Sequence, residues 1–91
     1  LIGRDTFLSL RRSRSTLQRT DHDRLRLVIA ELRVAVGLSR RQLSLRLGKA
    51  PTFIARVERG ERALEVFEFV DVCTALGADP AAILKSILKD A

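Results

Sequence analysis

Residues 39–60, with the sequence SRRQLSLRLGKAPTFIARVERG, restrict the possible folds of this chain more than any other segment. Leu43 and Leu47 lie four positions apart, which places both side chains on one face of a helix. Gly48 suits the left-handed conformation that ends many helices. Pro51 suits the first turn of a following helix, where its missing N–H group leaves no hydrogen bond unmade. The segment therefore predicts two short helices joined by a tight turn.

The ends and faces of these two helices can also be assigned. Ser39 is a candidate cap of the first helix, because its side-chain oxygen can accept a hydrogen bond from a free N–H group. Ser44 is small enough to let the second helix approach closely. The second helix ends at Gly60 and has an apolar edge formed by Ile54 and Val57, which are expected to face inward. The other side chains are expected to point outward: Thr52, Phe53, Arg56 and Arg59. Two outward arginines predict contact with a negatively charged partner.

Length and composition indicate one small helical domain. The chain has 91 residues, of which 46% are apolar, and it contains no Trp, Tyr or Met. The apolar fraction excludes a disordered chain, and a core of Leu, Val, Ile and Ala suits packed helices. The apolar segments are too short and too charged to span a membrane, and no signal peptide is evident. We therefore expect a cytoplasmic protein with no membrane contact.

The sequence offers little for catalysis or metal binding. His22 is the only histidine and Cys73 is the only cysteine, and they fall on different predicted helices. A metal site needs three or four ligands, so none is expected here. Cys73 lies on an apolar stripe and is expected to be a small buried side chain. No carboxylate pair, nucleophile–base arrangement or glycine-rich phosphate loop occurs, so we expect neither enzyme activity nor a cofactor.

Charge divides the chain into a basic front and an acidic back. The formal net charge is +6, and residues 1–62 carry 15 of the 17 basic side chains but only six of the 11 acidic ones. Fourteen of the basic side chains are arginines, whose planar guanidinium groups suit bidentate contacts with phosphate and guanine. The front is therefore expected to meet a polyanion, although ordinary solubilising charge explains the composition equally well.

Three further helices are predicted around this segment. One runs from a capping box at residues 20–23 to about Val36, with four side chains facing the core: Leu25, Ile29, Leu32 and Val36. Another covers about residues 65–76 and is expected to bury Val66, Phe69, Val70, Cys73 and Leu76. The last begins at Asp79 and Pro80 and has a broad apolar face: Ile83, Leu84, Ile87 and Leu88. No segment is a convincing strand, so residues 21–91 are expected to form an all-α bundle of five helices.

Residues 1–20 form a basic N-terminal extension with no clear helical or strand period. Its arginines alternate with Ser and Thr: Arg4, Arg11, Arg12, Arg14 and Arg19. Three interpretations stay open. The extension is an arm that follows a DNA backbone or minor groove, a flexible tail, or a segment that packs on a partner subunit through Phe7, Leu8 and Leu10.

Several segments taken together resemble a known family. They are Leu32-Arg33, Gly37-Leu38-Ser39, Gln42-Leu43-Ser44, Leu47-Gly48, Ile54, Val57-Glu58-Arg59-Gly60-Glu61-Arg62 and Ala75-Leu76-Gly77-Ala78-Asp79-Pro80. This pattern, over about residues 24–88, resembles the helix-turn-helix domain of phage repressors and Cro proteins, also called the xenobiotic-response-element (XRE) type. The resemblance implies a five-helix lambda-repressor-like bundle. It also implies a sequence-specific DNA-binding protein, because members of this family are mostly transcription regulators that act as dimers.

The resemblance implies roles for individual residues. The second helix of the motif, about residues 51–59, is then the recognition helix. The side chains implied to face base edges are Pro51, Thr52, Ala55 and Arg56. The side chains implied to lie at the DNA backbone are Ser39, Arg40, Arg41, Lys49, Phe53 and Arg59. Arg33 and Glu58 match a pair that bridges the first helix to the recognition helix, the alternative for Glu58 being an exposed acid at a helix end.

The start of the recognition helix departs from the family pattern. Family members often have a Ser or Thr cap there, followed by polar readers, whereas this chain has Ala50 and Pro51. A lost cap costs about 1 kcal/mol, which Pro51 partly offsets by restricting the backbone of the first turn. Base readout should then rest on Thr52 and Arg56. Arg56 contacts either a guanine or a phosphate, and only the first contact reads sequence.

These expectations combine into a DNA-binding transcriptional regulator, most simply a repressor, that binds an inverted repeat as a homodimer. Two recognition helices would enter successive major grooves about 34 Å apart. The dimer contact is expected from the fifth helix and the exposed end of the fourth: Phe67, Ile87 and Leu88. Two alternatives remain open. One is an antitoxin-like autoregulator whose acidic residues 63–91 bind a partner protein, and the other is a helix-turn-helix used for protein contact only.

Overall fold

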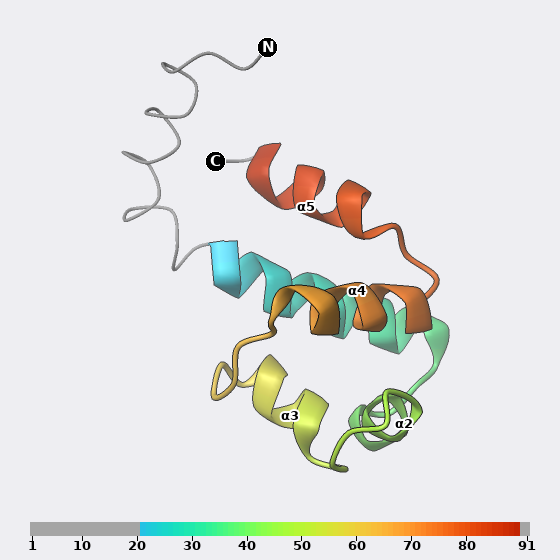
Figure 1. Cartoon of the computed structure of the whole chain (residues 1–91). Coiled ribbons are helices and arrows are strands. Elements are labelled where there is room, and N and C mark those ends of the chain that lie inside the picture. Colours follow the sequence, from blue (N-terminus) through green and yellow to red (C-terminus); the bar gives the residue numbers. More distant parts are fainter. Residues whose placement is uncertain (1–20, 90–91) are drawn as a thin grey trace.

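The computed structural model describes residues 21–89, and these residues form helices joined by short turns (Figure 1). The N-terminal helix is described over residues 21–36. It is followed by α2 (Arg40–Arg46), α3 (Phe53–Glu58), α4 (Val66–Ala75) and α5 (Pro80–Lys89). The described residues contain five helices and no strand, so the expected all-α class is confirmed. Thr20 of the expected first capping box and the basic extension of residues 1–20 lie outside the described part.

The helices are arranged around the N-terminal helix and α4, which cross one another (Figure 1). α5 runs back over this pair in the direction opposite to α4, and α2 and α3 lie together at the other end of the molecule. A hydrogen bond from Arg24 Nη1 to the carbonyl of Ile87, 3.3 Å long, joins the N-terminal helix to α5. The two helices of the predicted turn segment are thus presented at one end of a supporting bundle.

One core cluster joins four of the helices. Its buried members are Ile29, Leu38, Leu43, Phe53, Ile54, Val57, Val72 and Leu76. Three of these side chains come from α3, although that helix has only six residues. An isolated helix of this length is unstable in water, so α3 exists because its inward edge is buried against α2, α4 and the N-terminal helix.

Two of the expected core positions are wrong, and two buried residues of α4 were missed. Val36 is 49% exposed because it is the last residue of its helix, where the chain turns away at Gly37. Val66, the first residue of α4, is also exposed, whereas Val72 and Glu68 are buried. Apolar side chains occur almost all round α4, so the pattern alone leaves the rotation of this helix undetermined. A buried Glu68 also contradicts the usual rule for charge, and its partners are described below.

The predicted turn between α2 and α3 is present, with a difference in where α3 begins. Gly48 has a φ of 70°, which an L side chain rarely adopts, and it ends α2 as expected. Pro51 and Thr52 lie in a turn before α3 and not in its first helical residues. The reason is a tight turn over these two residues, closed by a 3.0 Å hydrogen bond from the N–H of Phe53 to the carbonyl of Ala50. α3 is therefore shorter than the helix expected over residues 51–59.

The difference between Ile29 and Val36 is directly testable. Ile29→Ala removes a side chain that is 2% exposed in the core, and it is expected to lower the free energy of unfolding by about 2–5 kcal/mol. Val36→Ala is the matched control on the same helix, and its effect should stay within about 0.5 kcal/mol. Urea denaturation followed by circular dichroism measures both. Equal losses in the two variants would contradict the described burial.

Candidate nucleic-acid interface

The start of α2 is capped by side chains as well as by the backbone. The Oγ atom of Ser39 accepts a hydrogen bond from the N–H of Gln42, and the Gln42 side chain accepts one from the N–H of Ser39, at 3.0 and 2.8 Å. This reciprocal capping box holds the first turn of α2 in place. Arg40 and Arg41, the first two residues of α2, are consequently presented in exposed positions on a rigid helix.

The exposed surface of α3 and its preceding turn includes most of the expected base-facing residues. Pro51, Thr52 and Arg56 are exposed, and Ala55 is half-buried. Phe53 differs from the expectation, because its side chain is only 6% exposed and belongs to the core cluster. A ring buried in this way is not available to lie along a DNA backbone.

Glu58 joins three helices at a single carboxylate. Arg33 of the N-terminal helix donates to it twice, with Nε–Oε2 at 2.7 Å and Nη2–Oε1 at 3.2 Å. Arg40 of α2 donates from Nε to Oε1 at 2.8 Å, and Arg33 Nη1 also donates to the carbonyl of Leu38 at 2.9 Å. Burial by itself would raise the pKa of Glu58, but the hydrogen bonds from Arg33 and Arg40 outweigh it and leave the pKa below its ordinary value. The position of α3 therefore depends on the charged form of Glu58.

Glu68 of α4 forms a second junction, with donors from the segments before and after α3. Arg62 donates to both of its oxygens at 2.7 and 2.8 Å, Lys49 donates at 3.0 Å, and the N–H of Glu65 donates at 3.0 Å. These donors, Arg62 foremost, lower the pKa of Glu68 to about 2. The Arg62 guanidinium and the Lys49 ammonium also lie over the Phe53 ring, at 4.7 and 5.4 Å from its centre. The turn before α3 and the loop after it are therefore tied to α4.

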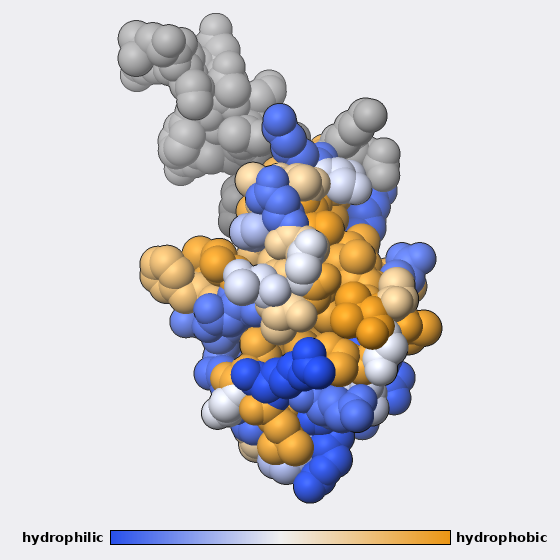
Figure 2. All heavy atoms as spheres, turned by 90° about the vertical axis from the view of Figure 1, so that its right-hand side faces the viewer, coloured by the Kyte–Doolittle hydropathy of each residue, from blue (hydrophilic) through white to orange (hydrophobic). Residues whose placement is uncertain are grey.

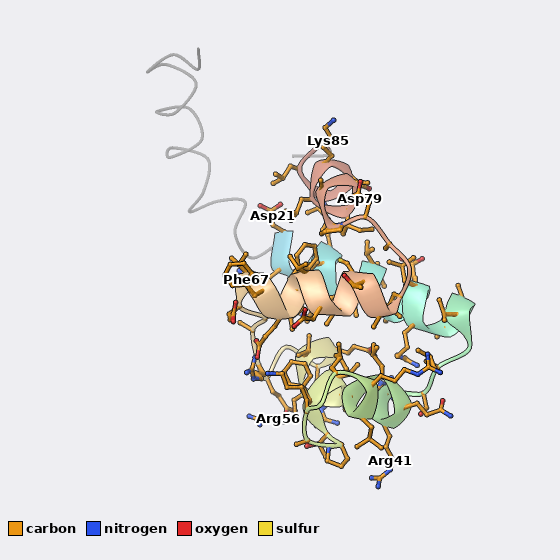
Figure 3. The ribbon with its side chains drawn as sticks, turned by 45° about the vertical axis from the view of Figure 1, so that its right-hand side comes forward. Asp21, Arg41, Arg56, Phe67, Asp79 and Lys85 are labelled. Carbon is orange, nitrogen blue, oxygen red and sulfur yellow. The ribbon has the colours of Figure 1, made fainter. Side chains whose placement is uncertain are left out.

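Basic side chains gather at the end of the molecule formed by α2 and α3. Figure 3 shows Arg41 and Arg56 at this lower end, opposite Asp79 and Lys85, and Figure 2 shows strongly hydrophilic side chains there, with hydrophobic ones between them. Among the described residues, no carboxylate lies within ion-pair distance of Arg41 or Arg56. Arg59 pairs with Glu61 at 2.8 Å, but both side chains are more than half exposed. An exposed pair of this kind is weak, so Arg59 can exchange Glu61 for another anion.

Arg40 and Lys49 combine two tasks. Each is bound to a buried carboxylate, yet the side chain of Arg40 is 58% exposed and that of Lys49 is 38% exposed. Both cations are therefore held in position while part of their donor capacity still faces solvent. The sequence predicted these two residues at a DNA backbone but missed the roles of Glu68 and Arg62. The only signal for the second junction was the Glu65–Glu68 spacing of a capping box.

The residues expected at a dimer contact do not all lie on the surface. Phe67, on the first turn of α4, is 74% exposed, and Leu88 of α5 is also exposed. Ile87 is 4% exposed and is buried within a single chain, so it does not belong to an exposed dimer surface. The broad apolar face expected for α5 is thus divided, because one side packs on the bundle and the other stays open to solvent.

Other classes of site have no support in the described residues. These residues contain no group of three or more His, Cys, Asp or Glu side chains that could hold a metal ion. Cys73 is buried, and burial raises the pKa of its thiol. None of the described helices combines the length and the apolar character needed to cross a membrane.

The fold and the site together define a class. Two short helices meet at a tight turn, the second lies in a fixed position over a helical bundle, and exposed arginines surround it. This is the arrangement of a helix-turn-helix DNA-binding domain.

Comparison with known proteins gives the family. A family model described as helix-turn-helix matches residues 29–83, more than half of the chain. Among solved structures, an XRE-family like protein from Pseudomonas syringae pv. tomato str. DC3000 is 33% identical, with a TM-score of 0.77, and the match covers 82% of this chain and 92% of that one. No curated protein sequence gives a significant match. The chain belongs to the XRE-type helix-turn-helix family, which confirms the resemblance seen in the sequence. This family makes it a DNA-binding regulator in general terms, and the fold is not typically enzymatic.

The junction at Glu68 predicts a specific pH dependence of stability. The folded pKa of about 2 lies below the ordinary value of 4.5, so the charged carboxylate stabilises the fold above pH 4.5. This contribution is lost as the pH falls towards 2. Glu68→Gln should lower the melting temperature at pH 7 and should show a smaller further loss between pH 5 and pH 2 than the parent chain does.

The matched control for this measurement is Glu61→Gln. This change removes an exposed carboxylate that forms an exposed ion pair with Arg59, so its effect on the melting temperature at pH 7 should be smaller. If the melting temperatures of the parent chain and Glu68→Gln change by the same amount between pH 5 and pH 2, the role given to Glu68 is contradicted.

Proposed function

We propose that this protein is a transcriptional repressor that binds an inverted-repeat operator as a homodimer, with α3 and the turn before it in the major groove. The observation that carries the proposal is the exposed set Pro51, Thr52 and Arg56 on an element held by two buried carboxylates. An element that reads bases must be rigid as well as exposed, because base contacts depend on closely defined positions. Repression then follows from occupancy of the operator.

The roles divide into base contacts and phosphate contacts. Thr52 and Arg56 carry the polar base contacts, and Arg56 can form two hydrogen bonds with a guanine. Pro51 and Ala55 offer only apolar surface, which suits a thymine methyl group. Five side chains around this centre are proposed to contact phosphates: Ser39, Arg40, Arg41, Lys49 and Arg59. The Ser39 hydroxyl already accepts a hydrogen bond from Gln42, and it keeps its own proton to donate to a phosphate oxygen.

The proposed dimer uses the open side of α4 and α5. These helices run in opposite directions, so Phe67 near the start of α4 and Leu88 near the end of α5 lie at the same end of the pair (Figure 1). Leu84 of α5 is exposed as well. A single module of this size makes few DNA contacts, so a second copy supplies affinity through a second half-site.

Selection from random DNA tests the proposed function. The parent chain is expected to enrich an inverted repeat whose half-sites lie about 10–10.5 base pairs, or a multiple, apart. Arg56→Ala should lose the preference at one position of each half-site, with about a tenfold or greater loss in affinity for the selected site, because one guanine contact is removed. Lys85→Ala is the control, since this exposed residue lies at the opposite end of the molecule (Figure 3).

Three outcomes of the selection would count against parts of the proposal. Failure of the parent chain to bind any DNA at low salt would remove the DNA function and leave the helix-turn-helix for protein contact. An equal loss on all sequences for Arg56→Ala would make this arginine a phosphate contact only. Enrichment of an asymmetric single site would remove the homodimer.

The dimer contact gives a separate prediction. Phe67→Ser removes the most exposed large apolar side chain of α4 and should raise the dimer dissociation constant by about tenfold or more. Val34→Ser, at a similarly exposed position on the N-terminal helix, is the matched control and should leave it unchanged. Analytical ultracentrifugation measures both. A monomeric parent chain, or an equal effect of the two changes, would place the dimer contact elsewhere or remove it.

A further inference from the structure

The recognition helix has no side-chain cap of its own. Thr52 occupies the N-cap position of α3, and its side chain makes no capping hydrogen bond. Ala50 has no polar side-chain atom, and Pro51 has no N–H group. The N–H of Phe53 donates to the carbonyl of Ala50, and the next donor of α3 is the buried N–H of Ile54, a residue that is completely buried in the core. A buried N–H without an acceptor is costly, so this group needs an acceptor from another part of the chain.

Ser44 supplies that acceptor from the neighbouring helix. Its residue is 0% exposed, and its Oγ atom accepts a 3.0 Å hydrogen bond from the N–H of Ile54. The same hydroxyl donates its proton to the carbonyl of Arg40 at 2.8 Å. An N-cap oxygen normally accepts from the second or third N–H of its own helix, and Ile54 is the second residue of α3. Ser44 therefore does for α3 what a local cap does for other helices.

The backbone of Ser44 also ends the preceding helix. Its carbonyl accepts hydrogen bonds from the N–H of Leu47 at 3.2 Å and from the N–H of Lys49 at 3.0 Å. The bond from Lys49 spans five residues across Gly48 and closes the end of α2. One residue therefore holds the end of α2 through its carbonyl and the beginning of α3 through its hydroxyl.

We propose that Ser44 is the positioning residue of the recognition helix: it sets where α3 begins relative to α2, and so which bases Thr52 and Arg56 reach. The proposal rests on the proposed DNA-binding function. α3 is only six residues long, so a shift of its first turn displaces both side chains. The alternative is that Ser44 matters only because it is small, in which case an alanine of similar size would serve as well.

Ser44→Ala separates the two roles, because it keeps the packing and the carbonyl but removes the hydroxyl. Amide hydrogen exchange at Ile54 should become about tenfold faster or more, since its acceptor is lost. The ratio of affinities for the selected site and for random DNA should fall by about tenfold, while binding to random DNA stays unchanged. Phosphate contacts dominate the random-DNA term, and four of the five proposed ones come from residues before α3: Ser39, Arg40, Arg41 and Lys49.

Thr74→Ala is the matched control. The Thr74 hydroxyl donates to the carbonyl four residues earlier in α4, as the Ser44 hydroxyl does in α2, but it accepts nothing from α3. This variant should keep the parent affinity ratio and the parent exchange rate at Ile54. If Ser44→Ala does not fold, Ser44→Cys keeps a side chain of similar shape with a weaker acceptor and should show the same changes to a smaller extent.

Each result decides a separate point. Parent-like exchange at Ile54 together with a parent-like affinity ratio in the Ser44 variants would overturn the inference. An equal fall of the ratio in Thr74→Ala would reduce Ser44 to a general effect on stability and overturn it too. If the parent chain itself binds no DNA, the proposed function fails, and with it the effect of Ser44 on base choice, whereas exchange at Ile54 still tests the cap.

Discussion

The ion pair between Arg33 and Glu58 is the interaction on which the rest of the structure depends. Both side chains are at most one-tenth exposed, and a buried charge without its partner is strongly destabilising. Each residue therefore requires the other, and the bidentate geometry allows one alignment of the N-terminal helix with α3. Arg40 of α2 shares the same carboxylate, so three helices meet at one group of atoms. These contacts hold α3 in a defined position, although a helix of six residues is too short to be stable by itself.

The second junction, at Glu68, completes the support and explains the distribution of charge. Glu58 and Glu68 between them bind four cations: Arg33, Arg40, Lys49 and Arg62. Without these two carboxylates, the four cations would lose their anionic partners and repel one another. With them, the buried Arg33 becomes structural, the three partly exposed cations are held in position, and Arg41 and Arg56 remain open to solvent. The same electrostatic network thus stabilises the fold and determines which positive charges a polyanion meets.

Several features of the helices could be predicted from the sequence, because they depend on local chemistry. Ser39 caps α2, Asp79 accepts from the N–H of Ala81, and Gly48 takes the left-handed conformation. The spacing of residues failed where burial depends on packing: Val36 is exposed at the end of its helix, Val66 is exposed because of how α4 is rotated, and Phe53 is buried. The Arg33–Glu58 pair lies 25 residues apart, and only the family resemblance indicated it.

By itself, the sequence determined an all-α domain with two short helices around a tight turn, a basic front, and membership of a helix-turn-helix family. Caps and glycines are read within a few residues of chain, and the charge division and the family motif are read from residue identities along the chain without any knowledge of packing. Only the tertiary structure decided which charges are buried and how α3 is capped. The hydroxyl of Ser44 reaches the N–H of Ile54 across ten residues, and Glu68 gathers donors from both sides of α3. The physical reason is that a hydrogen bond or ion pair between distant residues depends on how the helices pack, which no local pattern contains.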